Sequence, residues 1–143
     1  MNKDRKNQKE PAGAIFQMME KGIGRLFDLV FKKNQFEAFP RGELSKMWAD
    51  VEAMEPKMAI IEADKLVDTV LKRAGIKGES MADRLRRTEK MVDRSSYQAM
   101  WDAHKVRNQI VHEFDHGFDD NRANEVLWKM KKFLVSLGAF KNE

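Results

Sequence analysis

Apolar residues recur at intervals of three and four along most of the chain, which is the spacing of one face of an α-helix. The longest regular case lies between Pro56 and Ala74, with a stripe formed by Ala59, Ile60, Ala63, Leu66, Val67, Val70 and Leu71. Proline suits the first turn of a helix, where its missing N–H has no helical partner, and Gly75 suits a C-terminal cap. We therefore predict a long helix from Pro56 to Ala74, with Glu62 and Asp64 bordering its apolar stripe.

The same spacing predicts further helices on both sides of this one. Their expected ranges are 14–33, 43–54, 81–91, a segment from Ser95 or Ser96 to about Gly117, and a segment that starts near Asp119–Asn121 and ends before Gly138. Ser80 followed by Asp83 is a capping-box variant that begins the third of these helices. No segment alternates apolar and polar residues as a strand does. The predicted fold is all-α, an up-and-down antiparallel bundle of about five helices with short connections.

Residues 1–12 and residues 14–33 differ in composition. Residues 1–12 are mostly charged or amide side chains, too polar to form a core, so we expect a flexible tail there. The helix expected over 14–33 has an apolar stripe flanked by lysines and arginines, which fits either a core-facing helix or one on a membrane surface. A chain of 143 residues has room for one domain, which we place at 13–143.

Composition narrows the possible chemistry. The chain has no cysteine, which excludes disulfides and cysteine-held metals, so that any metal site must use His, Asp or Glu. No apolar run approaches the ~20 residues needed to span a bilayer and no signal-like segment begins the chain, so we expect a cytoplasmic protein without membrane insertion. The net charge of +4 and the basic segment with Arg84, Arg86, Arg87 and Lys90 fit either a solvated surface or contact with RNA phosphates.

Candidate chemistry is concentrated in Trp101–His116, which holds all three histidines. His104, Asn108, His112 and His116 are spaced by four and form one polar stripe, displaced from the apolar set Ala103, Val106, Ile110 and Phe114. Arg107 offers a fork of donors suited to phosphate, and histidine suits proton transfer near neutral pH. Arg107 and His112 lie about 140° apart on a helix, so they converge on one phosphate only through the long arginine arm or across a dimer.

The run Arg107-Asn108-Gln109-Ile110-Val111-His112, an R-N-x-x-x-H motif on the penultimate helix of an all-α domain, resembles the HEPN family of ribonuclease and nucleotide-binding domains. The segment AIIEADKLVDTVLKRAG is also similar to a long helix of that family. The resemblance implies a metal-independent endoribonuclease without a cofactor, in which Arg107, Asn108 and His112 are the catalytic residues. It further implies a homodimer with a composite site, and often an antitoxin partner. A non-catalytic module that binds RNA, a nucleotide or a protein is the alternative.

Three further assignments stay open on the sequence alone. His112, Glu113 and His116 spell a zinc-protease motif, but Asp115 places a charge inside it, Gly117 is expected to end the helix, and no third histidine follows. Family members that keep an acidic residue near the arginine suggest Glu62 or Asp64 for that position. His104 and His116 lie outside the R-N-x-x-x-H motif, and we expect surface positions for them, with a second proton donor as the alternative.

Overall fold

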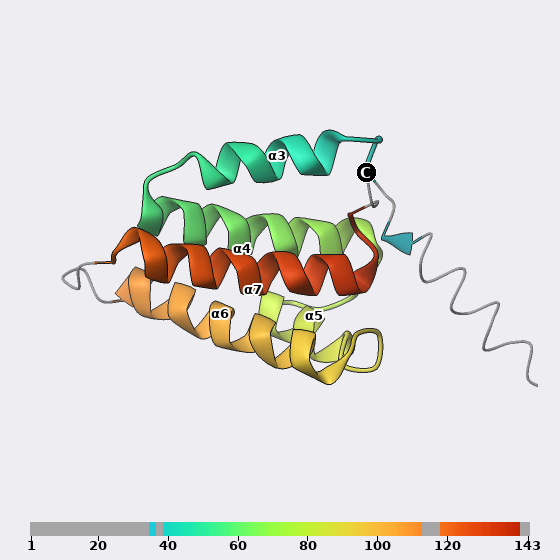
Figure 1. The fold of residues 1–143 in the computed structure, drawn as a ribbon. Coiled ribbons are helices and arrows are strands. Elements are labelled where there is room, and N and C mark those ends of the chain that lie inside the picture. Colours follow the sequence, from blue (N-terminus) through green and yellow to red (C-terminus); the bar gives the residue numbers. More distant parts are fainter. Residues whose placement is uncertain (1–34, 37–38, 113–117, 141–143) are drawn as a thin grey trace, which may run out of the picture. The chain divides into compact units, whose positions relative to one another are not determined.

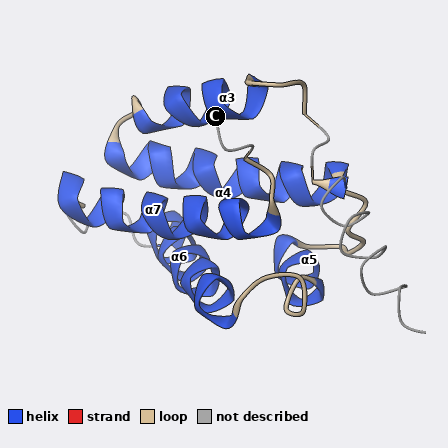
Figure 2. Cartoon of the chain, turned by 45° about the vertical axis from the view of Figure 1, so that its right-hand side comes forward, coloured by secondary structure: helices blue, strands red, loops and turns tan. Residues whose placement is uncertain are grey.

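A computed structural model describes residues 35–36, 39–112 and 118–140. Within these ranges the chain forms α3 (Glu43–Glu52), α4 (Pro56–Arg73), α5 (Met81–Arg87), α6 (Arg94–His112) and α7 (Asp120–Leu137) (Figure 1). Figure 2 shows only helices and loops in this part of the chain, which confirms the all-α prediction. The tail expected over 1–12 and the helix expected over 14–33 lie outside the described residues.

The four long helices run alternately in opposite directions, as an up-and-down bundle requires. In Figure 1, α4 and α7 run side by side in the same direction, whereas α3 and α6 run the opposite way. Helix α4 contacts each of the other four helices, and α6 packs against both α4 and α7. The short helix α5 lies beside α4 in the connection that leads to α6. None of the helices in the described ranges combines the length and apolar character that crossing a bilayer would require.

The ends of α4 follow from local chemistry, as predicted. Pro56 occupies the first turn, and the Glu55 carboxylate accepts a hydrogen bond from the Met58 N–H at 3.3 Å. At the other end Gly75 has φ 79°, and the Ile76 N–H reaches back to the Leu71 carbonyl at 3.0 Å, the bond of a Schellman motif. All seven residues of the predicted apolar stripe are buried. Helix α7 likewise begins at its Asp119 cap and ends at Gly138, as expected.

Helix α6 begins one residue earlier than its predicted cap, because the cap is Asp93. The Asp93 carboxylate accepts hydrogen bonds from the Ser96 N–H at 2.8 Å and from the Ser96 hydroxyl at 2.7 Å. An aspartate offers two acceptor oxygens, and both are used here. The prediction that Ser95 or Ser96 caps α6 is therefore wrong. Its expected end at Gly117 lies outside the described residues.

Helix α5 keeps its predicted start but ends early. The Ser80 hydroxyl accepts from the Asp83 N–H at 3.1 Å and the Asp83 carboxylate accepts from the Ser80 N–H at 3.2 Å, so the capping box is confirmed. The helix stops at Arg87, short of the expected Met91. The buried Thr88 hydroxyl donates to the Leu85 carbonyl at 2.7 Å, and a turn closed from Met91 N–H to the Thr88 carbonyl follows.

The buried face of α6 differs from those of α4 and α7. The faces of α4 and α7 are apolar except at Asp64, whereas the buried residues of α6 are Ser96, Met100, Ala103 and His104. Two of these four side chains are polar, and each needs a hydrogen-bonding partner inside the bundle. The partner of His104 comes from α4, and the pair marks the candidate site.

Candidate functional site

Asp64 is a carboxylate inside the apolar stripe of α4. It lies four residues after Ile60 and three before Val67, both fully buried, and is itself only 3% exposed. The expectation that Asp64 borders the stripe is therefore wrong. A buried carboxylate is costly unless it is paired and hydrogen-bonded, so its partners determine whether this position is tolerated.

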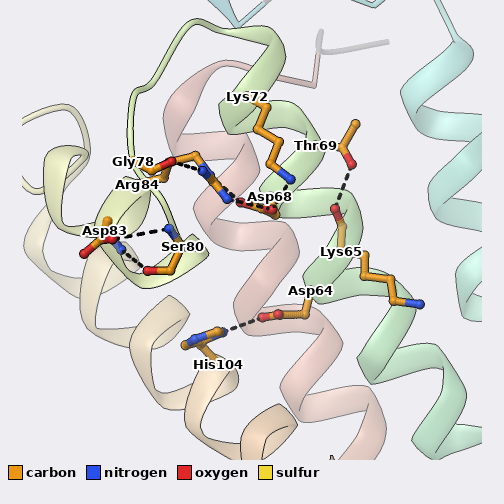
Figure 3. A network of polar contacts seen from close by, with 10 residues as sticks. All are labelled: Asp64, Lys65, Asp68, Thr69, Lys72, Gly78, Ser80, Asp83, Arg84 and His104. Atoms are coloured by element: carbon orange, nitrogen blue, oxygen red, sulfur yellow. Dashed lines mark hydrogen bonds and ion pairs between the residues drawn. The ribbon is translucent and has the colours of Figure 1, made fainter.

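His104 is the first partner of Asp64. Its Nδ1 lies 2.9 Å from the Asp64 Oδ1, and Figure 3 shows the imidazole of α6 pointing at the carboxylate of α4. His104 is buried, so the expected surface position of this histidine is wrong. When the imidazole is neutral, an Nδ1–H that donates to Asp64 leaves Nε2 as an acceptor. The contact thus fixes both the orientation and the tautomer of the ring.

Arg107, one helical turn further on, is the second partner. Its Nε lies 3.5 Å from the Asp64 Oδ2, but without the alignment of a hydrogen bond, and among the described residues this buried Nε has no hydrogen-bonding partner. The side chain is 28% exposed, so the guanidinium spans the boundary between core and surface. Asp64 therefore compensates the charge of Arg107 from the buried side, while the guanidinium extends toward the surface.

Asn108 directs the head of Arg107. The Arg107 Nη1 donates to the Asn108 Oδ1 at 3.0 Å. Asn108 and His112 are four residues apart, about 40° around the helix, so this hydrogen bond draws the guanidinium toward the side of α6 that carries His112. His112 is exposed and is the last residue of α6. No hydrogen bond joins Arg107 to His112; the structure brings together Arg107 and Asn108, and leaves His112 on the adjoining surface.

Glu62, the other carboxylate considered beside Arg107, lies elsewhere. It pairs with Lys65 at 2.7 Å and lines a pocket of about 280 Å³ between α3 and α4, together with Met47, Asp50, Val51, Met54, Lys65, Leu66 and Thr69. Of the two carboxylates considered, Asp64 is the neighbour of Arg107. Which of the two carboxylates lies beside Arg107 is decided by how α4 packs against α6.

The basic segment around α5 divides into a buried and an exposed part. Arg84 is buried, and its guanidinium binds the Asp68 carboxylate at 2.6 and 3.1 Å and the Gly78 carbonyl (Figure 3). Burial raises the pKa of Asp68, but hydrogen bonds and charge from Arg84 and Lys72 outweigh it, so the pKa lies below its usual value. Arg84 thus joins α5 to α4 and is not available to a ligand, whereas Arg86, Arg87 and Lys90 are exposed.

The alternative zinc motif is only partly visible. Glu113 and His116 lie outside the described residues, as does the expected surface position of His116. Within the described ranges no group of three or more His, Asp or Glu side chains is arranged to hold a metal ion. The structure therefore describes only His112 of that motif.

The Asp64–His104 pair is the part of the site that sequence reasoning missed. A signal was present: Asp64 stands at i+4 from Ile60 and at i−3 from Val67, within the register of the apolar stripe. A carboxylate in that register requires a buried partner, and His104 and Arg107, three residues apart, share one face of another helix.

The arrangement can hold an anion through the arginine and the asparagine, with an exposed histidine on the same side. The sequence was compared with known protein families and with curated proteins, and the chain with solved structures, and no match was found. The HEPN resemblance therefore rests on the residues of the motif and on its helical setting.

Proposed function

We propose that the protein is a metal-independent endoribonuclease whose site consists of Arg107, Asn108 and His112. The observation that supports this proposal most directly is the hydrogen bond from Arg107 to Asn108. It turns the guanidinium toward the face of α6 that carries His112, which offsets the angular separation between the two motif residues. Asp64 supports the same arrangement because its buried charge favours an arginine at this point of the bundle.

In the proposed reaction the RNA 2′-hydroxyl attacks the adjacent phosphorus. The new O2′–P bond forms as the P–O5′ bond breaks, leaving a 2′,3′-cyclic phosphate and a 5′-hydroxyl end. His112 acts as general base or general acid: it accepts the proton of the 2′-hydroxyl or donates one to the leaving 5′-oxygen. Arg107 stabilises the negative charge that builds on the non-bridging phosphoryl oxygens, and Asn108 holds the guanidinium in position.

Within one copy, Arg107 and His112 lie about 140° apart around α6 and no hydrogen bond joins them, so a second copy offers a way to bring an arginine and a histidine onto one phosphate. A two-fold dimer that brings two α6 helices together supplies the second His112 and a second Arg107, since an isologous interface presents each residue twice. We therefore include a homodimer in the proposal. The biological setting that follows is a toxin of a toxin–antitoxin or defence system, held inactive by an antitoxin protein bound over the site.

A cleavage assay in chelator tests the proposal. We expect the purified protein to cut tRNA or another structured RNA in EDTA, giving cyclic-phosphate ends, and His112→Ala to lose the activity by 10²-fold or more. Gln109→Ala is the matched control, since Gln109 is exposed on the same helix, and it should retain full activity. Cleavage that EDTA abolishes, or that survives in His112→Ala, contradicts the mechanism.

The second candidate is a non-catalytic module that holds RNA or a nucleotide. The observation that favours it is the partly exposed Arg107 guanidinium, which lies beside the buried Asp64 and donates to Asn108, because such a group can bind a phosphate without any proton transfer. RNA binding without cleavage, lost in Arg107→Gln and retained in His112→Ala, would identify this function. Stoichiometric zinc in the purified protein would instead support the protease motif.

A further inference from the structure

One flank of α6, next to its buried face, carries six residues in a single register. Arg94, Tyr97, Trp101, Lys105, Asn108 and His112 follow each other at intervals of three or four. At 100° per residue, all of them lie within about 40° of the direction of Trp101. We call this set the α6 outer stripe. It spans about 27 Å along the helix, and every member is exposed or half-buried.

The middle of the α6 outer stripe is aromatic. The Tyr97 and Trp101 rings meet edge to face at a centroid distance of 6.2 Å, and Trp101 meets the His104 ring in the same way at 6.1 Å. The Arg86 guanidinium lies 5.8 Å from the centroid of the Trp101 ring. Arg86 lies over the Trp101 ring and the ring packs partly against the core, so this half-buried side chain offers an unpaired base only the part of its surface that remains open to solvent.

Cationic side chains lie along the same stripe. Arg94 and Lys105 belong to the α6 outer stripe itself, and Arg86 of α5, which is also paired with Asp83 at 2.8 Å, lies over the Trp101 ring. Arg87 and Lys90 are exposed on and after α5. The one acidic residue between Arg94 and His112 is Asp102, about 100° around the helix from Trp101. The stripe therefore joins cations, flat aromatic surface and the motif residues Asn108 and His112.

We propose that the α6 outer stripe binds single-stranded RNA and leads it to His112. The backbone phosphates contact Arg94, Lys105 and Arg86, and an unpaired base stacks on Trp101. Cationic grooves with interleaved aromatic rings suit single strands, whose bases are free to stack, better than duplexes. This inference rests on the proposed function for the reaction at His112, and it adds the form of RNA that the site accepts.

The opposite flank of α6 supplies a matched control. Helix α7 packs there: Lys132 donates to the Ser95 hydroxyl, and Ser95 lies about 120° around α6 from Trp101. Lys132 also lies 5.3 Å from the ring of Trp128, an exposed tryptophan on α7. Trp128 therefore resembles Trp101 in having a cation beside its indole, but it is more exposed and lies outside the stripe.

Binding is measured with a 2′-O-methyl single-stranded oligonucleotide, which lacks the attacking hydroxyl and stays intact. By fluorescence anisotropy we expect Trp101→Leu to weaken binding by roughly 5- to 100-fold, as expected when one base–aromatic stack is removed. Trp101→Phe should retain most of the affinity, and Trp128→Leu all of it. Lys105→Ala should make the slope of log K against log salt less steep by about 0.7, whereas the exposed Lys65→Ala on α4 should not.

The proposal is overturned if Trp101→Leu and the unchanged protein bind the single strand with equal affinity. It is also overturned if a duplex of the same sequence binds as tightly as the single strand. If Trp101→Leu lowers the mass measured by light scattering and leaves RNA affinity unchanged, the stripe is an interface between copies. Should this variant fail to fold, Lys105→Ala and Arg94→Ala, both at exposed positions, decide the question. If the stripe variants weaken RNA binding but no RNA is cleaved, the ribonuclease proposal is wrong and the binding stripe stands. If RNA is cleaved in EDTA but the stripe variants bind RNA as tightly as the unchanged protein, the binding stripe is wrong and the ribonuclease proposal stands.

Discussion

At the scale of single residues, Asp64 explains why Arg107 is partly buried whereas His112, in the same motif, is exposed. Its carboxylate is buried between helices and depends on His104 and Arg107 for compensation. Arg107 therefore contributes to the fold as well as to the candidate site. His112 is exposed at the end of α6 and does not pair with Asp64.

Replacing Arg107 is expected to destabilise the protein, whereas replacing His112 is not. Arg107→Ala leaves Asp64 with His104 as its one partner among the described residues. We expect this to lower the free energy of unfolding by about 1–3 kcal/mol, below the roughly 3–5 kcal/mol of a fully buried pair, because Arg107 is partly exposed. His112→Ala should change it by less than about 0.5 kcal/mol. Urea unfolding at pH 7 measures both. Equal stabilities for the two variants would contradict a structural role of Arg107.

The candidate site was predictable from the sequence only where its members are close in the chain. Arg107, Asn108 and His112 fall within six residues, and the helix register relates them to one another. The contact of Asp64 with His104 joins residues 40 positions apart on two helices, so it depends on how α4 packs against α6. Helix periodicity alone contains no information about that packing, and for this reason His104 was expected on the surface.

At the scale of the helices, predictions succeeded where the determinants are local. Pro56, Gly75, Ser80 with Asp83, and Gly138 each act within one turn of their own helix, and each lies where its chemistry predicts. The start of α6 is the exception, because its Asp93 cap is also local, with Ser96 three residues on, and the prediction placed the cap at the serines that follow. The Ser136 hydroxyl, 43 residues away, donates to the Asp93 carboxylate at 2.9 Å.

The Asp93 cap makes the stability of the protein depend on acid. Hydrogen bonds from the Ser96 hydroxyl, the Ser96 N–H and the Ser136 hydroxyl lower the pKa of Asp93 to about 2. A carboxylate with a lowered pKa contributes stability above its unfolded value of about 3.9, and this contribution is lost as the pH falls through about 4 toward 2. Asp93→Asn removes this loss because an amide does not titrate. Thermal melts between pH 2 and 6 should therefore show a shallower acid decline for the variant.

Asp102→Asn is the control for the acid experiment, because Asp102 is an exposed carboxylate on the same helix. Its melting temperature should fall with pH as that of the unchanged protein does. Asp68 and Asp83, whose pKa values are also lowered, contribute equally to all three proteins. Parallel acid limbs for Asp93→Asn and the unchanged protein would show that the cap does not govern this dependence.

At the scale of the whole molecule, the proposed dimer predicts complementation between inactive variants. If Arg107 of one copy works with His112 of the other, a mixed dimer of Arg107→Gln and His112→Ala contains one intact site. Random exchange of equal amounts makes half of the dimers mixed, which should restore about one quarter of the activity of the unchanged protein. RNA cleavage by the variants alone and after mixing measures this. A mixture as inactive as its components would place both residues of each site in one copy.

The burial of Asp64 also determines which inactivating substitutions leave the protein stable. If expression is harmful to the host cell, as the toxin proposal holds, survivors will carry inactivating substitutions. On the proposed function, changes at His112 would abolish the chemistry and leave a stable chain that still binds the proposed antitoxin. Changes at Arg107 weaken the compensation of Asp64, so they reduce abundance as well. Surviving lineages that keep the protein as a regulator should therefore have lost His112 and retained both Arg107 and Asp64.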